Sequence, residues 1–183
     1  MFYNMQYLYF RMKDDQMGPV HVHKKLFTQT WLDHFLKEGY MFGQETTQYV
    51  YYYRFLSKLD HISNRGEVLE CVFIAKRNAF DFYSEEVDKE IDQILMLHKK
   101  GRNIKKIVVL QYKRYNELND KVENEIDQII CFTNRFQYLV HITVGYFEKD
   151  NQVYFLSPKT KYANKYYYYG CQEIRKQIGL FEE

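Results

Sequence analysis

The sequence predicts an α+β fold: a mixed sheet with a central β-α-β-α-β unit, a following β-hairpin and flanking helices. The main observation is an internal echo, because "VDKEIDQIL" (87–95) is nearly repeated as "VENEIDQII" (122–130). Each copy follows an apolar run rich in β-formers, at 69–77 and 106–114, as expected of two strand-plus-helix units. A further run at 140–147 alternates between two sets of residues, as a strand does.

The two echoed segments have the apolar spacing of amphipathic helices. Ser84 is a candidate N-cap for the first helix and Asn119 for the second, and Gly101 can close the first. Strands joined by helices are usually parallel, so we expect the three strands of the unit to be parallel. The expected buried faces are Val87, Ile91, Ile94, Leu95 and His98, then Val122, Ile126, Ile129, Ile130 and Thr133.

The segment after the third strand predicts a hairpin. "EKDN" (148–151) is typical of a turn, and "QVYFL" (152–156) returns as a strand. The C-terminal segment 157–180 should be helical and should begin at its Ser-Pro pair. Gly170 is a candidate break that would divide this segment into two pieces.

The N-terminal third gives a weaker pattern. Residues 6–12 are typical of a strand, and residues 28–39 of a helix capped at Thr28 or Thr30 and ended by a glycine. Residues 46–59 are ambiguous, because their apolar spacing fits a helix while their residue types favour a strand. No linker rich in Gly, Pro or Ser divides the chain, so we expect a single domain, residues 1–183.

The composition is that of a folded protein. The chain is 46% hydrophobic and 19% aromatic, whereas disorder goes with few aromatics and a high net charge. A formal net charge of +2 gives no global basic field, so nucleic-acid binding would need a local patch. The abundance of Tyr, Lys, Ile, Phe and Asn is what an AT-rich coding sequence produces, as in many phages and mobile elements.

The sequence also predicts where the protein acts. It has no run of 18 apolar residues and no signal peptide, so we expect a cytoplasmic protein without membrane contact. Cys71, Cys131 and Cys171 are far apart and odd in number, and are expected to be reduced thiols. The phosphate-binding loops and the nucleophile elbow that mark common enzyme classes are absent from the sequence.

His21 and His23 flank one valine, and on a strand both would point the same way. Two imidazoles can begin a metal site, but spacing places no third ligand. Pro19 precedes the pair, and Lys24 and Lys25 follow it, where they would oppose a cation. We therefore expect an exposed or edge-strand pair, and neither a metal site nor a cofactor.

The same pair resembles the histidine motif of the HUH endonucleases, which nick single-stranded DNA. "YANK", Tyr162 to Lys165, is similar to the Tyr-x-x-Lys of their replication-initiator branch. The resemblance implies that His21 and His23 hold a divalent metal while Tyr162 attacks the phosphate. It covers seven residues, and the motifs lie 139 residues apart, whereas in those initiators they are usually much closer.

"HITV" (141–144) resembles one half of the signature of the 2H phosphoesterases. The resemblance implies that His141 is an acid or base acting on a phosphate, together with a second histidine. The other candidate half is His61-Ile-Ser63, in a segment with the composition of a turn. The alternative is a polar strand face, on which His141 and Thr143 meet solvent or a neighbour.

Two segments, 101–114 and 158–169, are basic and contain no acidic residue. The second also has five tyrosines, whose rings can stack bases while lysines contact phosphates. Tyrosine is equally common at protein interfaces and on half-buried elements, so nucleic acid, a protein partner and neither stay open. The candidate contact residues are Arg102, Lys105, Lys106, Lys113, Arg114, Lys159, Lys161, Lys165, Tyr166, Tyr167 and Tyr168.

The function that these features favour is a small, non-enzymatic binding protein. It would act on nucleic acid or on a nucleoprotein or protein partner, and we expect a homodimer because so many rings must be covered. A phage or mobile-element accessory role, such as inhibiting a host defence nuclease, fits the size and composition. The alternative is a metal-dependent or histidine-based phosphodiesterase or nuclease that uses His21, His23, His141 or Tyr162.

Overall fold

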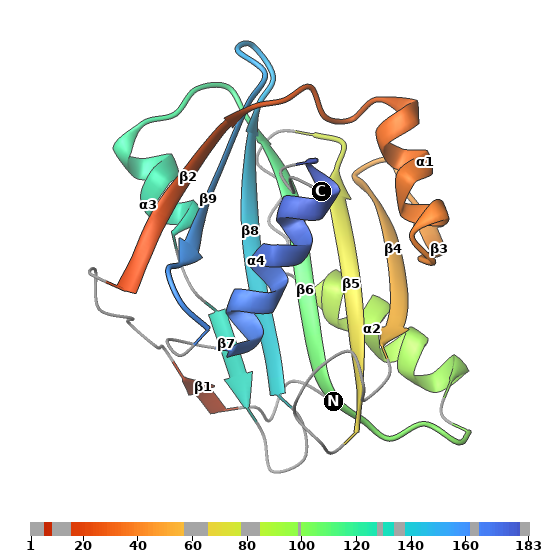
Figure 1. Cartoon of the computed structure of the whole chain (residues 1–183). Coiled ribbons are helices and arrows are strands. Elements are labelled where there is room, and N and C mark those ends of the chain that lie inside the picture. The colour runs from red at the N-terminus through yellow and green to blue at the C-terminus, as the bar shows by residue number, and fades with distance from the viewer. Residues whose placement is uncertain are drawn as a thin grey trace.

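A mixed β-sheet runs through the protein, with helices on both of its faces (Figure 1). The computed structural model describes residues 6–8, 16–56, 66–77, 85–98, 100–127, 130–133, 138–161 and 165–179. The strands are β1 (Gln6–Leu8), β2 (Met17–His23), β3 (Met41–Glu45), β4 (Tyr49–Leu56), β5 (Glu67–Ala75), β6 (Ile104–Tyr115), β7 (Ile130–Thr133), β8 (Tyr138–Phe147) and β9 (Gln152–Pro158). The helices are α1 (Gln29–Lys37), α2 (Glu85–Leu97), α3 (Asp120–Ile126) and α4 (Lys165–Gln177). The predicted α+β class is confirmed.

The central unit is the one that the internal echo predicts. β5 pairs with β6 and β6 with β8, both in parallel, so that Val109 lies between Cys71 and His141. α2 connects β5 to β6, and α3 follows β6. Asn119 caps α3, accepting a hydrogen bond from the backbone N–H of Val122 at 3.0 Å. The cap predicted at Ser84 lies outside the described residues.

The second helix is shorter than its apolar spacing predicts. α3 ends at Ile126, where the N–H of Asp127 donates to the carbonyl of Glu123 at 2.8 Å. Ile130 and Thr133, assigned from the sequence to the helix face, belong to β7, which pairs antiparallel with β8. The four residues of β7 are β-branched, aromatic or Cys, which favours a strand once a sheet edge is available.

The two faces of the sheet are covered by different helices. Figure 1 shows α4 crossing in front of the sheet and α2 lying behind it. α1 and α4 share a core cluster with one set of alternating strand residues, such as Leu110 and Ile142. α2 packs on the opposite set, including Val109 and Leu139, and Ile126 of α3 packs in a separate cluster.

The N-terminal third resolves the ambiguous segment as a strand. β4 lies inside 46–59, and five consecutive tyrosine and valine side chains of β4 are buried because both faces of the sheet are covered. α1 begins after Thr28, whose hydroxyl accepts from the N–H of Trp31 at 3.2 Å, and Gly39 follows the helix with a φ of 84°. β1 confirms the start of the strand predicted at 6–12; residues 9–12 lie outside the described residues. β3 was not predicted.

The C-terminal helix differs from its prediction in two ways. The Ser157-Pro158 pair does not start the helix; it ends β9, where Pro158 is the partner of Met17 in β2. Gly170 does not divide α4, which is continuous. A Cβ at Gly170 would lie 2.4 Å from Cδ1 of Ile142, so the glycine lets the helix lie close to the sheet.

One edge of β8 is shared by two strand pairs. β7 pairs with residues Tyr138 to His141, while β9 pairs with Gly145 to Phe147, and β2 then pairs along the whole of β9. The predicted hairpin between β8 and β9 is therefore confirmed. None of the helices among the described residues has both the length and the apolar character needed to cross a membrane.

Candidate functional site

The structure brings part of the predicted basic and tyrosine-rich surface together. The start of β6 meets the start of α4, where Nζ of Lys106 lies 4.4 Å from the centre of the Tyr166 ring. Lys159 and Lys161 are exposed nearby in the chain, between β9 and α4, and Lys165 is partly exposed. Lys106 and Tyr166 thus define one face at the start of α4, and Lys161 and Lys165 belong to the segment around that start.

Two of the predicted contact residues are not on the surface. Tyr167 is fully buried in the core beneath α4, because α4 turns that side toward the sheet. Lys113 is also buried, on the opposite face of the sheet, and its Nζ lies 2.6 Å from Oε1 of Glu125. Neither side chain can contact a partner in this structure, so both predictions are corrected here.

The predicted arginines are engaged in local contacts. Arg102 pairs with Glu67 at 3.0 Å and its guanidinium lies 4.0 Å from the centre of the Phe55 ring. Arg114 lies over Phe27 at 4.2 Å, at the other end of β6. The candidate residues of 101–114 are therefore distributed over both ends of one strand rather than gathered in one patch.

The histidines of the nuclease alternative lie apart. His21 and His23 are exposed on β2, which pairs only with β9 among the described strands. His21 in β2 is paired with Tyr154 in β9, and Tyr154 is paired with Gly145 in β8. Gly145 and His141 are four residues apart along β8, which corresponds to roughly 13 Å of strand. Tyr162 and His61 lie outside the described residues.

His141 is not a polar residue facing solvent. It is buried on β8, and burial lowers the pKa of its imidazole to about 3, with Lys113 adding to the shift. Its neighbour Thr143 is buried as well and accepts a hydrogen bond from Nε2 of Gln111. Within the described part of the chain, no three His, Cys, Asp or Glu side chains are grouped as they would be around a metal ion.

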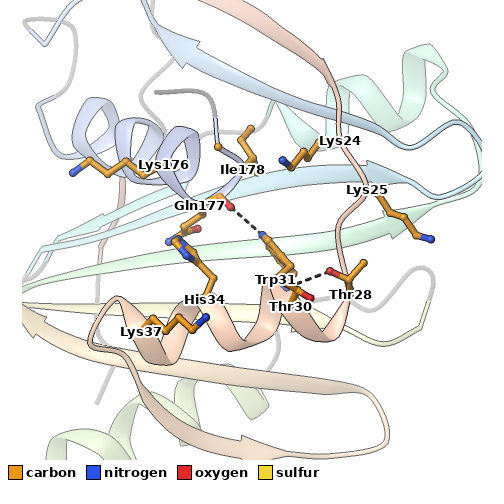
Figure 2. A pocket seen from close by; sticks show the side chains of 11 residues that line it. Lys24, Lys25, Thr28, Thr30, Trp31, His34, Lys37, Lys176, Gln177 and Ile178 are labelled. Atoms are coloured by element: carbon orange, nitrogen blue, oxygen red, sulfur yellow. Dashed lines mark hydrogen bonds between the residues drawn. The ribbon is translucent and has the colours of Figure 1, made fainter. Parts of the chain in front are cut away.

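A cavity of about 390 Å³ lies between α1 and the C-terminal end of α4. Its lysine and histidine lining residues come from three segments, as Figure 2 shows: the connection after β2, helix α1 and helix α4. They are Lys24, Lys25, His34, Lys37 and Lys176, and together they define what we call the basic pocket. No Asp or Glu lines it among the described residues.

The connection from β2 to α1 positions the first two lysines. It crosses one end of the sheet in Figure 1, and Lys24 N–H donates to the carbonyl of Asn151 at 2.8 Å. Leu26 is buried, and the Phe27 ring packs on Tyr146 at 4.9 Å while Arg114 covers it. This anchoring fixes the loop, while Lys24 and Lys25 stay exposed.

A buried polar network holds the α4 side of the basic pocket. Trp31 donates from Nε1 to the backbone carbonyl of Gln177 at 3.0 Å (Figure 2). The Gln177 side chain donates to the Tyr40 hydroxyl at 2.9 Å and accepts from the Tyr112 hydroxyl. The Tyr40 hydroxyl donates in turn to Glu70. The pocket wall is therefore tied to the core of the sheet.

Three of the four pocket lysines differ from the fourth in their surroundings. Lys24, Lys25 and Lys37 are exposed and form no ion pair in the described residues, while Lys176 lies 3.7 Å from Glu173. The sequence did not reveal this site, although Lys24, Lys25, His34 and Lys37 all lie within residues 24–37 and only Lys176 is far from them in the chain. Lys24 and Lys25 were interpreted only as opposing a metal.

Comparisons of the chain with models of protein families, with curated proteins and with solved structures found no match.

Proposed function

We propose that the protein is a non-enzymatic binder of nucleic acid, and that the basic pocket contacts phosphate. The observation that carries the proposal is a cavity whose lining includes four lysines and His34, and no carboxylate among the described residues. In a protein of formal net charge +2, such a concentration of positive charge is local rather than general. The role predicted from composition, that of a cytoplasmic phage or mobile-element accessory protein acting on a nuclease complex, is compatible with it.

Phosphate contact is the chemistry that best uses this lining. Lysines that neutralise phosphates release counterions, so the binding free energy depends steeply on salt. Exposed lysines that repel one another gain most when an anion lies between them. The Lys106 and Tyr166 face supplies a second surface of the type that can contact phosphates and bases, and the proposal predicts a smaller contribution from it.

The experiment compares three charge-reversed double variants. The pocket variant is Lys25→Glu with Lys37→Glu, and the face variant is Lys161→Glu with Lys165→Glu. The control is Lys89→Glu, which changes an exposed residue of α2 on the opposite face of the sheet, combined with Lys149→Glu in the hairpin turn. Binding of a fluorescent single-stranded oligonucleotide is measured by anisotropy over a range of salt concentrations.

The pocket variant should bind about tenfold more weakly or worse, with a shallower salt dependence, because contacts with phosphate are lost. The control variant should bind like the unchanged protein. Equal weakening of the pocket and control variants would mean that net charge alone drives binding. No binding by the unchanged protein at low salt would refute the proposed function.

A further inference from the structure

We propose that Arg54, Glu70 and Glu173 form a proton-controlled latch that holds the end of helix α4 against the sheet. In the closed latch, Arg54 pairs with Glu173 of α4 while Glu70 of the sheet carries a proton. In the open latch, Glu70 is ionised, attracts Arg54 to itself and releases the end of α4. The latch is a property of the protein without any ligand, and its opening changes one wall of the basic pocket.

Arg54 is placed to connect several elements at once. It lies on β4, and its Nη2 is 3.2 Å from Glu70 on β5 and 2.9 Å from Glu173 on α4. Its Nη1 donates to the carbonyl of Glu38, the C-cap of α1, at 3.0 Å, and its guanidinium lies 4.2 Å from the centre of the Tyr40 ring. One side chain thus joins two strands of the sheet to both helices that border the basic pocket.

The two carboxylates that share Arg54 have different surroundings. The side chain of Glu70 is 4% exposed, whereas that of Glu173 is 13% exposed and also lies 3.7 Å from Nζ of the exposed Lys176. A buried carboxylate that shares its guanidinium with a second carboxylate regains little of its desolvation cost from the pair. Glu70 is therefore the carboxylate that takes up a proton, and burial raises its pKa to about 7.

The other titratable groups around Glu70 keep their protons. Tyr40, before β3, donates its hydroxyl to Glu70, and Tyr112 of β6 interacts with the Glu70 charge. Burial raises the pKa of both phenols well above the ordinary value. Burial also raises the pKa of the thiol of Cys71, the next residue of β5. Of these four groups, Glu70 is the one that changes charge near neutral pH.

The end of α4 that Glu173 holds is the end that lines the basic pocket. Gln177 follows Glu173 by one turn, and its backbone carbonyl accepts from Trp31 at 3.0 Å (Figure 2). The Gln177 side chain donates at 2.9 Å to the Tyr40 hydroxyl, which in turn donates to Glu70. A change of charge at Glu70 therefore reaches the pocket wall by two routes, through the shared arginine and through Tyr40.

The direction of the switch follows from the burial of Glu70. An ionised Glu70 attracts Arg54 in a buried environment, whereas the attraction of Glu173 is weakened by solvent and by Lys176. The two ionised carboxylates also repel each other across the arginine. Because the Glu70 pKa is raised in the folded protein, docking of the end of α4 is strongest at low pH and weakens as pH rises through about 7.

Trp31 provides a direct readout of the latch. It is the single tryptophan of the chain, and its hydrogen bond to Gln177 makes its fluorescence sensitive to the end of α4. Emission and amide hydrogen exchange of residues 173–179 are followed over roughly pH 5.5–8.5, the window around the Glu70 pKa. Exchange is corrected for its intrinsic pH dependence, and no oligonucleotide is present, so the result is independent of nucleic-acid binding.

Three variants separate the latch from other causes. Glu70→Gln is neutral at every pH and should keep the latch closed, while Glu173→Gln removes the α4 partner of Arg54. The control is His34→Gln, because this histidine lies one turn after Trp31 on α1 and is itself titratable.

In the unchanged protein, raising the pH should shift the emission to longer wavelength and accelerate exchange at 173–179 about tenfold or more, since one unit of pKa shift corresponds to a tenfold change in an equilibrium constant. Glu70→Gln should abolish both changes, and His34→Gln should keep them. Glu173→Gln should move the midpoint to lower pH, because the Glu173 charge contributes to the raised pKa of Glu70.

A transition that persists in Glu70→Gln, or no transition in the unchanged protein, would overturn the latch. Loss of the transition in His34→Gln would assign it to the histidine and overturn the latch as well. If Glu70→Gln does not fold, Glu173→Gln decides the question, and an unmoved midpoint in that variant contradicts the proposal.

Discussion

Glu70 places a carboxyl group inside the core, next to the residues that support the basic pocket. It lies 3.2 Å from Arg54, which also contacts Glu173 at 2.9 Å, and it accepts from the Tyr40 hydroxyl. Burial raises the pKa of Glu70 to about 7, and Glu173 adds to the rise while Arg54 opposes it. One arginine is thus shared by two carboxylates, and burial raises the Glu70 pKa against the opposing effects of Arg54 and of the Tyr40 hydrogen bond.

The Glu70 pKa gives a signed prediction for stability. Because the folded pKa of about 7 exceeds the ordinary value of 4.5, the contribution of Glu70 is complete below 4.5 and is lost as pH rises through 7. The loss across this window is about 3 kcal/mol. Glu70→Gln should remove this falling component, as measured by urea unfolding at a series of pH values. An unchanged pH profile would contradict the assignment.

His141 should change the pH dependence of stability in the opposite direction to Glu70. Its folded pKa of about 3 lies below the ordinary value of 6.5, so its contribution is present above 6.5 and is lost as pH falls toward 3. In His141→Gln, the free energy of unfolding should therefore decrease less on acidification than in the unchanged protein. Steeper acid destabilisation of the variant would show that the imidazole is protonated in the folded state.

Gly170 tests the contact between α4 and the sheet. A methyl group there would collide with Ile142, which is fully buried, so Gly170→Ala should destabilise the protein by about 1–3 kcal/mol despite the better helix propensity of alanine. Gly18→Ala is the matched control, because its new Cβ would meet Lys159 at an ordinary 3.7 Å. Denaturant unfolding measures both, and a neutral Gly170→Ala would mean that α4 can move away from the sheet at little cost.

Residue types in the sequence did not distinguish surface cations from buried ones. Lys113 and Arg114 are adjacent and equally basic, yet alternation along β6 directs the first to the face of α2 and α3 and the second toward Phe27. Tyr167 differs from Tyr166 and Tyr168 by its position on the helix face, which depends on where α4 begins. The direction in which each side chain points could therefore be predicted only once the strand and helix boundaries were known.

At the level of elements, the capping of α1 links stability to the basic pocket. Thr28 accepts from the N–H of Trp31 and also lines the pocket. Thr28→Ala should cost about 1 kcal/mol of unfolding free energy, while Thr28→Ser should keep most of it. The measurement is denaturant unfolding of the three proteins, and equal losses in both variants would show that the methyl group matters rather than the hydroxyl.

The elements were predictable where pattern and residue type agreed. The two strands that precede the echoed segments, and the first of the two helices, have both the pattern and the residue types, and the structure confirms them. At 122–130 the helical spacing continues to Ile130, but Ile130 is the first residue of β7, so the predicted C-terminal end of the second helix was wrong. At 46–59 the residue types were the better guide, because a central strand buried on both faces need not alternate.

For the whole molecule, self-association stays a prediction, and the structure suggests its location. β3 ends the sheet order among the described strands, and the side chains of Met41 and Phe42 on it are exposed. An apolar sheet edge of this kind favours pairing with a second chain. Phe42→Lys should shift light scattering from a dimer to a monomer of 22.5 kDa, and a monomeric unchanged protein would end the idea.

Local composition alone does not predict the basic pocket. Its lysines come from the connection after β2, from α1 and from the end of α4, and only the docking of both helices on one sheet face brings them together. The contact between Lys106 and Tyr166 joins the two basic segments that local composition indicated.

The most direct test of the account is to map the nucleic-acid contact by the amide chemical shifts of the protein. Titration with a 5′-phosphorylated single-stranded oligonucleotide should shift the amides of residues 24–37 and 176–179, which border the basic pocket. Smaller shifts are expected around residues 159–168. Shifts concentrated on α2, or spread evenly over the surface, would contradict the claim that the basic pocket is the phosphate site.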